Sequence, residues 1–378
     1  MKKLLLAGVA AFAVAGAANT ASAEIDIELG GFVKGYASFV DQDETAGNEV
    51  RAFDLLRHSE VHAGGETTLD NGLTVGVHME GEIDGLADNR GIEESYMYFS
   101  GGWGRINAGA EDGANYLLQV AAPSADANVD GIRQFIQPFN YTALLGAVNL
   151  ATPQITNAIA NDADGALTLD YENNASGYGN KITYLTPVVA GLQGGISYTP
   201  DPSSGLDFGG NNLDNNAGQG DVFEVAGRYE GDFEGVGFAF GAGWTQGQEE
   251  TGGAGLDDQT QWNVGLDMDF AGFGLGVVYT VDNNGLAEVA GTVEDEETLV
   301  VGVDYDAGAF KLGASYMNVD NTWGVSNLDT NRYTGGVVYE YGPGMTFRGS
   351  VQYVEHENAG ALGDVDGTAV LLGTQINF

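Results

Sequence analysis

Residues 223–378 repeat one unit: a segment of about ten alternating apolar and polar residues, followed in turn by a tight link or a long acidic one. Because neighbouring residues of a strand point to opposite faces, each segment divides into two faces. In one segment, Trp262, Val264, Leu266, Met268 and Phe270 share a face, while Asn, Gly and Asp occupy the other. The pattern predicts an all-β chain whose strands are apolar on one side only.

Aromatic residues stand at nearly every strand end of this repeat. Those beside short links are Phe233, Phe270, Phe273, Tyr305, Phe310 and Tyr341, and those beside long links are Phe223, Trp244, Trp262, Tyr279, Tyr316, Tyr333 and Tyr353. Rings at two levels are typical of the two interfaces of a membrane. Ten steps of about 3.3 Å, tilted by roughly 40°, rise about 25 Å, the height of the apolar band of such barrels. We therefore predict a transmembrane antiparallel β-barrel, with a soluble β-sandwich as the alternative.

The first residues predict export. Two lysines precede an apolar run at residues 4–17, and Ala21-Ser22-Ala23 matches a signal-peptide cleavage site. We expect residues 1–23 to be a cleaved signal peptide and residues 24–378 to form the barrel. The later sequence has no uninterrupted apolar stretch of about eighteen residues, so transmembrane helices are not expected. Because the chain has no Cys, its fold cannot depend on disulfides.

The composition is strongly acidic, with 54 Asp and Glu against 13 Lys and Arg and a formal net charge of −41. Such a charge repels phosphate backbones, so nucleic acid is not an expected partner. It favours cations as solutes. A solvated surface suited to a salty or divalent-rich medium explains the charge equally well.

Strand segments recur along the whole chain. We expect strands near residues 29–40, 54–69, 73–83, 94–100, 103–110, 181–185, 192–198, 222–232 and 236–245, and seven more up to Phe378. The total is about sixteen, an even number as in bacterial barrels. Short links such as Asp70-Asn71-Gly72 have the residues that tight turns need and are expected to face the periplasm, with the long links outside.

One link, at residues 111–180, is far longer than the others and contains apolar residues such as Phe135 and Phe139. A structureless linker of that size is improbable in a compact fold. We therefore expect the segment to fold into the barrel lumen. An independent inserted domain is the alternative.

Four segments together carry a family likeness: residues 59–73, residues 102–109, the run of residues 181–187, and the terminal Gln375-Ile376-Asn377-Phe378. They resemble, in this order, the general porin family of Gram-negative bacteria, especially its alphaproteobacterial members. The resemblance implies a homotrimeric, water-filled channel of sixteen strands in the outer membrane, surrounded by membrane lipid and lipopolysaccharide. It implies that residues 111–180 form the constriction, and that the outer-membrane assembly machinery reads the terminal Phe378.

In such porins an acidic third loop faces a wall of Arg and Lys. Here Glu60 and Gly64 stand where basic residues are common, and Ala110 follows Gly109 where Arg is common. By strand parity, the residues expected on the lumen wall are Lys34, Glu60, His62, His78, Glu80, Arg105 and Arg348, and opposite them we place the loop residues Glu111, Asp112, Asp126 and Asp130. Since charges of one sign select ions of the other, we expect a preference for cations.

The expected function is passive diffusion of small hydrophilic solutes and ions. A substrate-selective porin is one alternative, and an exported acidic calcium-binding or adhesive β protein is another. No Gly-x-Ser-x-Gly motif, Cys nucleophile or His-Glu-x-x-His motif occurs, so we expect no enzyme activity.

Candidate metal ligands are few. Asp162 and Asp164 resemble half of a calcium loop without its downstream Glu, so weak structural calcium is the one candidate cofactor. His58, His62 and His78 share a parity on two strands that are expected to pair, which makes a metal site conceivable. The simpler interpretation is that these histidines are polar wall residues in contact with water.

Overall fold

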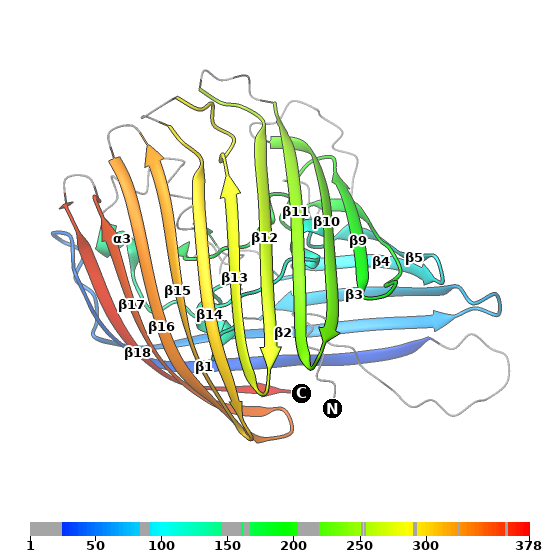
Figure 1. Ribbon diagram of the computed structural model, residues 1–378, viewed down its shortest axis with the longest axis horizontal. Helices are drawn as coiled ribbons and strands as arrows, with labels where there is room; N and C mark the ends of the chain where they lie inside the picture. The colour runs from blue at the N-terminus through cyan, green and yellow to red at the C-terminus, as the bar shows by residue number, and fades with distance from the viewer. Residues whose placement is uncertain are drawn as a thin grey trace.

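The structure, a computed structural model, describes residues 25–83, 91–145, 160–161, 167–202, 219–250, 252, 255–289, 293–323, 326–359 and 362–378. Sixteen antiparallel strands close into one barrel (Figure 1). They are β1 (Asp26–Gln42), β2 (Phe53–Thr68), β3 (Thr74–Glu82), β4 (Glu94–Gly101), β5 (Gly104–Ala110), β8 (Asn180–Leu185), β9 (Leu192–Thr199), β10 (Gln219–Phe233), β11 (Val236–Glu249), β12 (Gln259–Phe270), β13 (Phe273–Asp282), β14 (Glu296–Ala307), β15 (Phe310–Trp323), β16 (Ser326–Gly342), β17 (Met345–Glu357) and β18 (Val365–Asn377). The predicted all-β class and the strand count are confirmed.

Consecutive strands pair around the ring, with β5 pairing to β8 across the long link. The ring closes where β1 pairs with β18, and there Phe378 and Gly31 exchange two backbone hydrogen bonds of 3.0 Å. Closure leaves no unpaired sheet edge in the barrel, as a sheet surrounded by lipid requires. The alternative of an open, soluble sandwich is therefore wrong.

The outer face of the barrel is apolar and carries aromatic rings at the strand ends. Leu29, for example, exposes 74% of its surface. Rings on adjacent strands touch, with centroids 4.4 Å apart for Phe273 and Tyr305 beside the short links and 5.0 Å apart for Tyr316 and Tyr333 toward the opposite strand ends. These contacts follow from alternation, which places every second residue outward at the same level as its neighbour on the next strand.

The hairpin of β15 and β16 departs from the predicted alternation of short and long links. Its strands stay paired out to Trp323 and Ser326, well beyond the aromatic rings. Cross-strand hydrogen bonds support this extension, such as the 2.6 Å bond from Asn318 Nδ2 to Asp329 Oδ1. The long link predicted between these strands is thus wrong, because the alternating polar residues there continue the ladder.

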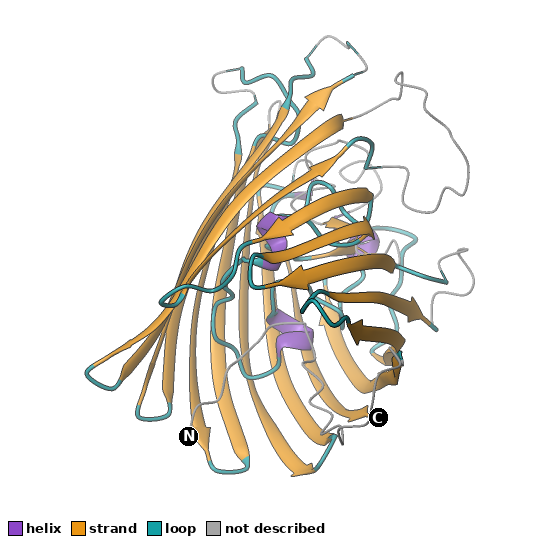
Figure 2. Ribbon diagram, turned by 90° about the vertical axis from the view of Figure 1, so that its right-hand side faces the viewer, coloured by secondary structure: helices purple, strands orange, loops and turns teal. Residues whose placement is uncertain are grey.

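The link between β5 and β8, residues 111–179, is called the third loop below. It holds α1 (Ala114–Leu117), α2 (Ala127–Asp130) and α3 (Tyr141–Leu145), and a separate sheet of β6 (Ala160–Asn161) and β7 (Leu167–Thr168). Figure 2 shows the helices within the ring of strands, and α1 contacts β9, β10 and β11 while α3 contacts β18. Among the described residues, no helix is long and apolar enough to cross a membrane.

Glycines on the inner face of six consecutive strands leave room for the third loop. This glycine track consists of Gly241, Gly265, Gly276, Gly302, Gly313 and Gly336. A Cβ at Gly241 would lie 2.8 Å from Val120 Cγ2, and one at Gly276 would lie 2.5 Å from Pro123 Cδ. The loop backbone can therefore lie directly on the wall only because these positions have no side chain.

Candidate functional site

Buried hydrogen bonds fix both ends of the third loop to the inner wall. Near its start, Asn115 Nδ2 donates to Thr245 Oγ1 at 2.8 Å, and near its end Ser176 Oγ donates to Glu224 Oε1 at 2.5 Å. All four side chains are buried. Because the wall holds the described part of this loop at both ends, it is an inward fold of the barrel. The alternative of an independent inserted domain does not fit these contacts.

Arg133 gathers the acidic side chains of the third loop. Its Nη2 lies 2.7 Å from Asp112 Oδ1, and its Nε bonds a carboxylate oxygen of Glu172. The guanidinium also lies 4.1 Å from the ring centroid of Tyr116. The sequence predicted that Asp112 faces the wall, but its carboxylate instead forms an ion pair with a basic residue of its own loop.

Asp126 connects the loop to the wall at β1 and β17. It accepts hydrogen bonds from Tyr36 Oη at 2.8 Å and from Arg348 Nη1 at 2.5 Å, and it exposes only 1% of its surface. The Arg348 and Asp126 contact is one place where a loop carboxylate meets a wall base. Removing both charges of such a buried ion pair from water is costly, and good geometry with additional hydrogen bonds offsets this cost.

The other two predicted loop carboxylates have different neighbours. Glu111 accepts a 2.6 Å hydrogen bond from Asn107 Nδ2, and Asn107 in turn accepts one of 2.6 Å from Arg105 Nε. Asp130 accepts a 2.6 Å bond from Ser315 Oγ on β15, away from the predicted wall residues. Burial raises the pKa of Glu111 to about 7 and that of Asp130 to about 6.

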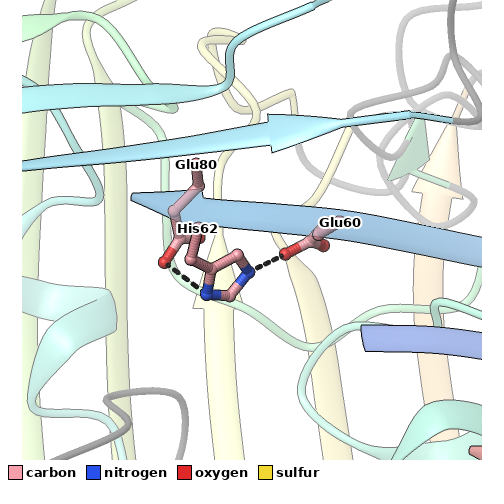
Figure 3. Close-up of side chains that lie close together, drawn as sticks. All are labelled: Glu60, His62 and Glu80. Atoms are coloured by element: carbon pink, nitrogen blue, oxygen red, sulfur yellow. Dashed lines mark hydrogen bonds and ion pairs between the residues drawn. The ribbon is translucent and has the colours of Figure 1, made fainter. Parts of the chain in front are cut away.

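Histidine and glutamate residues alternate on the inner faces of β2 and β3. The strand register sets His62 opposite Glu80 and Gly64 opposite His78. His62 Nε2 lies 2.8 Å from Glu60 Oε2, and His78 Nε2 lies 2.7 Å from Glu80 Oε1. Figure 3 shows how the side chains of Glu60 and Glu80 flank the imidazole of His62. Each of these carboxylates thus contacts an imidazole of its own strand.

Lys34 is withdrawn from the lumen by aromatic rings. Its Nζ lies 4.0 Å from the ring centroids of both Phe32 and Phe135, and the residue exposes only 4% of its surface. Phe135 comes from the third loop and stacks on His58 with centroids 4.9 Å apart. The loop therefore covers the cation of β1, which weakens its influence on solutes in the lumen.

Several residues of this region were not singled out from the sequence. Glu82 and Glu94 have the same parity as Glu80 on their strands, so alternation could have indicated them. Arg133 is the single basic residue of the segment 111–180, which was a usable signal. Phe135 was noted only as an apolar residue of the long link, and its contacts with Lys34 and His58 had no sequence signal, because the third loop has no strand or helix period around it. The candidate calcium ligands Asp162 and Asp164 lie outside the described residues.

A family model described as Gram-negative porin matches residues 8–359. A comparison with curated proteins finds no match. Among solved structures, the chain is similar to the anion-selective porin from Comamonas acidovorans, with 18% identity, coverage of 94% of this chain and 100% of that one, and a TM-score of 0.65.

It is also similar to OmpT of Vibrio cholerae, with 14% identity, coverage of 95% and 99%, and a TM-score of 0.57. A variant of the porin from Rh. blastica gives 18% identity, coverage of 93% and 100%, and a TM-score of 0.55. At these identities the structural likeness shows the fold alone.

Proposed function

This chain belongs to the Gram-negative porin family, and we propose that its lumen passes small hydrophilic solutes by diffusion and prefers cations. Membership of this family makes the protein a channel of the outer membrane and not an enzyme. Membrane lipid and lipopolysaccharide are the usual surroundings of the family, and its channels need no cofactor. The selectivity of the Comamonas acidovorans porin does not transfer, since ion preference depends on side chains and not on the fold.

The observation that carries the cation preference is how the inward-facing bases are engaged. Arg348 pairs with Asp126, Arg133 pairs with Asp112, and Lys34 lies between two rings. In contrast, the carboxylates of the wall of β2 to β4 outnumber its three imidazoles; they are Glu60, Glu80, Glu82 and Glu94. These three bases are therefore paired with loop carboxylates or covered by rings, whereas the acids outnumber the imidazoles on the wall of β2 to β4.

A few carboxylates are enough to select ions in a narrow lumen. Two unit charges 4 Å apart interact by about 1 kcal/mol in water and by about 4 kcal/mol at an effective dielectric constant of 20. Acids of the distant loops contribute little, because physiological salt screens exposed charges beyond about 8 Å. The wall of β2 to β4 therefore matters more than the total charge of the chain.

Ion substitution in planar bilayers tests this proposal. Purified protein should give stepwise, ohmic conductance in KCl. Replacing K⁺ with the bulky Tris cation should lower the conductance more than replacing Cl⁻ with gluconate. Glu80→Gln should reduce this difference, whereas the control Glu340→Gln, at an exposed strand end, should not. Absence of steps from folded protein would refute the channel, and a larger effect of gluconate would refute the cation preference.

We further propose that three copies assemble through the outer face of β1 and β18. Gly35 and Ala37 are small outward residues, and a Cβ at Gly35 would meet no atom within 4 Å. Larger apolar side chains make more contact with lipid, whereas small side chains let the backbones of two proteins approach closely. Gly31 and Thr374 support this less, because backbone atoms crowd Gly31 and the Thr374 hydroxyl bonds Thr346 O. Cross-linking in native membranes should give trimers that Gly35→Trp reduces; a monomer at native abundance would contradict the proposal.

We also propose that the outer-membrane assembly machinery recognises Phe378. The residue exposes 63% of its surface, and its backbone ends the ladder at Gly31. Deleting Phe378 should lower the amount of heat-modifiable barrel in the membrane but leave refolding in detergent intact. Equal amounts in the membrane with and without Phe378 would argue against recognition.

A further inference from the structure

The inner face of β2, β3 and β4 brings imidazoles and carboxylates from three strands to one place. The register sets His62 opposite Glu80, and Glu80 opposite Glu94. Glu60 precedes His62 by two residues and therefore lies on the same face. The resulting set of Glu60, His62 and Glu80 lies on strands of a closed sheet, so the backbone positions are rigid (Figure 3).

The atoms that could coordinate an ion are already close together. His62 Nε2 lies 2.8 Å from Glu60 Oε2, and His62 Nδ1 lies 3.5 Å from Glu80 Oε1. One nitrogen or oxygen atom from each of the three residues lies within 4.8 Å of the others. Zinc bonds of about 2.0–2.2 Å in a tetrahedral arrangement place ligand atoms about 3.4 Å apart. The two contacts use different nitrogens of the imidazole, and one ion binds only one of them. Coordination by all three residues therefore requires one carboxylate to turn toward the nitrogen that the other already contacts, over a separation of at most 4.8 Å.

Neighbouring side chains orient the set from outside. His58 Nε2 lies 3.0 Å from Glu60 Oε1, the oxygen that does not contact His62. The ring of Phe32 meets the imidazole of His62 edge to face with centroids 5.8 Å apart. Outer partners that fix ligand orientation are typical of protein metal sites.

We propose that Glu60, His62 and Glu80 bind a divalent transition-metal ion on the lumen wall. An imidazole with two carboxylates suits Zn²⁺ and its neighbours, whereas Ca²⁺ requires six to eight oxygen ligands, more than the set offers. His78 and Glu94 form a second set that shares Glu80. Sharing Glu80 allows one set to be filled at a time, and we assign the ion to the His62 set because both of its carboxylates contact the imidazole.

The bound ion would act on the channel through its charge. It adds two positive charges to a wall that is otherwise acidic, and in a narrow lumen this opposes the passage of other cations. The binding step itself does not depend on the proposed cation preference. The interpretation without a metal is that each imidazole is simply hydrogen-bonded to its carboxylates.

Calorimetric titration of the detergent-solubilised, folded protein with ZnCl₂ tests the site. Micromolar Zn²⁺ should bind the wild type, and His62→Ala and Glu80→Gln should each weaken binding about tenfold or more. Heat-modifiable migration checks that each variant has folded, and the two different substitutions guard against the failure of one. His78→Ala is the matched control and should retain the wild-type affinity.

Two results would overturn the proposal. One is a folded wild type that binds no Zn²⁺ at micromolar concentration, which would leave the channel function untouched if the same preparation conducts. The other is binding that is lost in His78→Ala and retained in His62→Ala, which would place the ion elsewhere. Single-channel recordings should in addition show that micromolar Zn²⁺ lowers the K⁺ current of the wild type but not that of His62→Ala.

Discussion

Gly302 offers the sharpest test of how the third loop lies on the wall. A Cβ at this position would overlap the carbonyl oxygen of Pro123 and lie 2.9 Å from its carbonyl carbon. These are backbone atoms, so a side-chain rotation cannot relieve the clash. In Gly302→Ala the loop must withdraw from β14 by roughly 1 Å, and overpacking of this kind costs about 1–3 kcal/mol. Displacement from the wall is displacement into the lumen, so conductance should fall.

The matched control is Gly335→Ala, in which the nearest atom to the new Cβ is Gly313 O at 4.0 Å. Single-channel conductance and unfolding in detergent should be measured for both variants. We expect Gly302→Ala to lower both conductance and the free energy of unfolding, and Gly335→Ala to change neither. If Gly302→Ala conducts and unfolds like the wild type, the loop does not lie on the glycine track and the reasoning fails.

The remaining predictions concern charges of the loop and its wall. Arg348→Met leaves Asp126 buried without its cation and should lower the free energy of unfolding by about 3 kcal/mol. The double variant with Asp126→Asn should restore most of this loss. Equal stability of the single and double variants in denaturant titrations would contradict this. The pKa values of about 7 for Glu111 and about 6 for Asp130 lie above the ordinary range, so both carboxyls take up protons as the pH falls from about 8 to about 5. The ratio of K⁺ to Cl⁻ permeability should therefore fall over that range, and Glu111→Gln should remove the part near pH 7. The folded state holds these two protons more tightly than the unfolded state does. The protonated carboxyls therefore favour folding at low pH, and this contribution to the free energy of unfolding is lost as the pH rises through about 7.

The barrel could be predicted from the sequence because its signals are local. Alternation with a period of two separates the faces of each strand, and glycines with positive φ such as Gly72 and Gly235 mark tight turns. The hairpin of β15 and β16 shows the limit of this reasoning. Polar alternation beyond the aromatic rings looks like a loop in the sequence, and only the pairing with the next strand turns it into a longer hairpin.

The contacts of the third loop could not be predicted because they join distant parts of the chain. Asp126 and Arg348 are 222 residues apart, and no local period relates them. Parity places a wall residue on a face, but it does not tell which base a loop carboxylate meets. Asp112 therefore was expected opposite the wall, whereas it pairs with Arg133 of the same loop.

The central claim is that carboxylates of the third loop and of the wall of β2 to β4 make the channel prefer cations, and the reversal potential across a KCl gradient tests it most directly. At about pH 8 the wild type should give the sign of a cation-selective pore. Glu111→Gln with Asp112→Asn should reduce this potential strongly, since it also leaves Arg133 with less compensation, whereas Glu294→Gln with Asp295→Asn in a distant link should change it little. A wild-type potential of the anion-selective sign would contradict the account and show that the lumenal bases dominate.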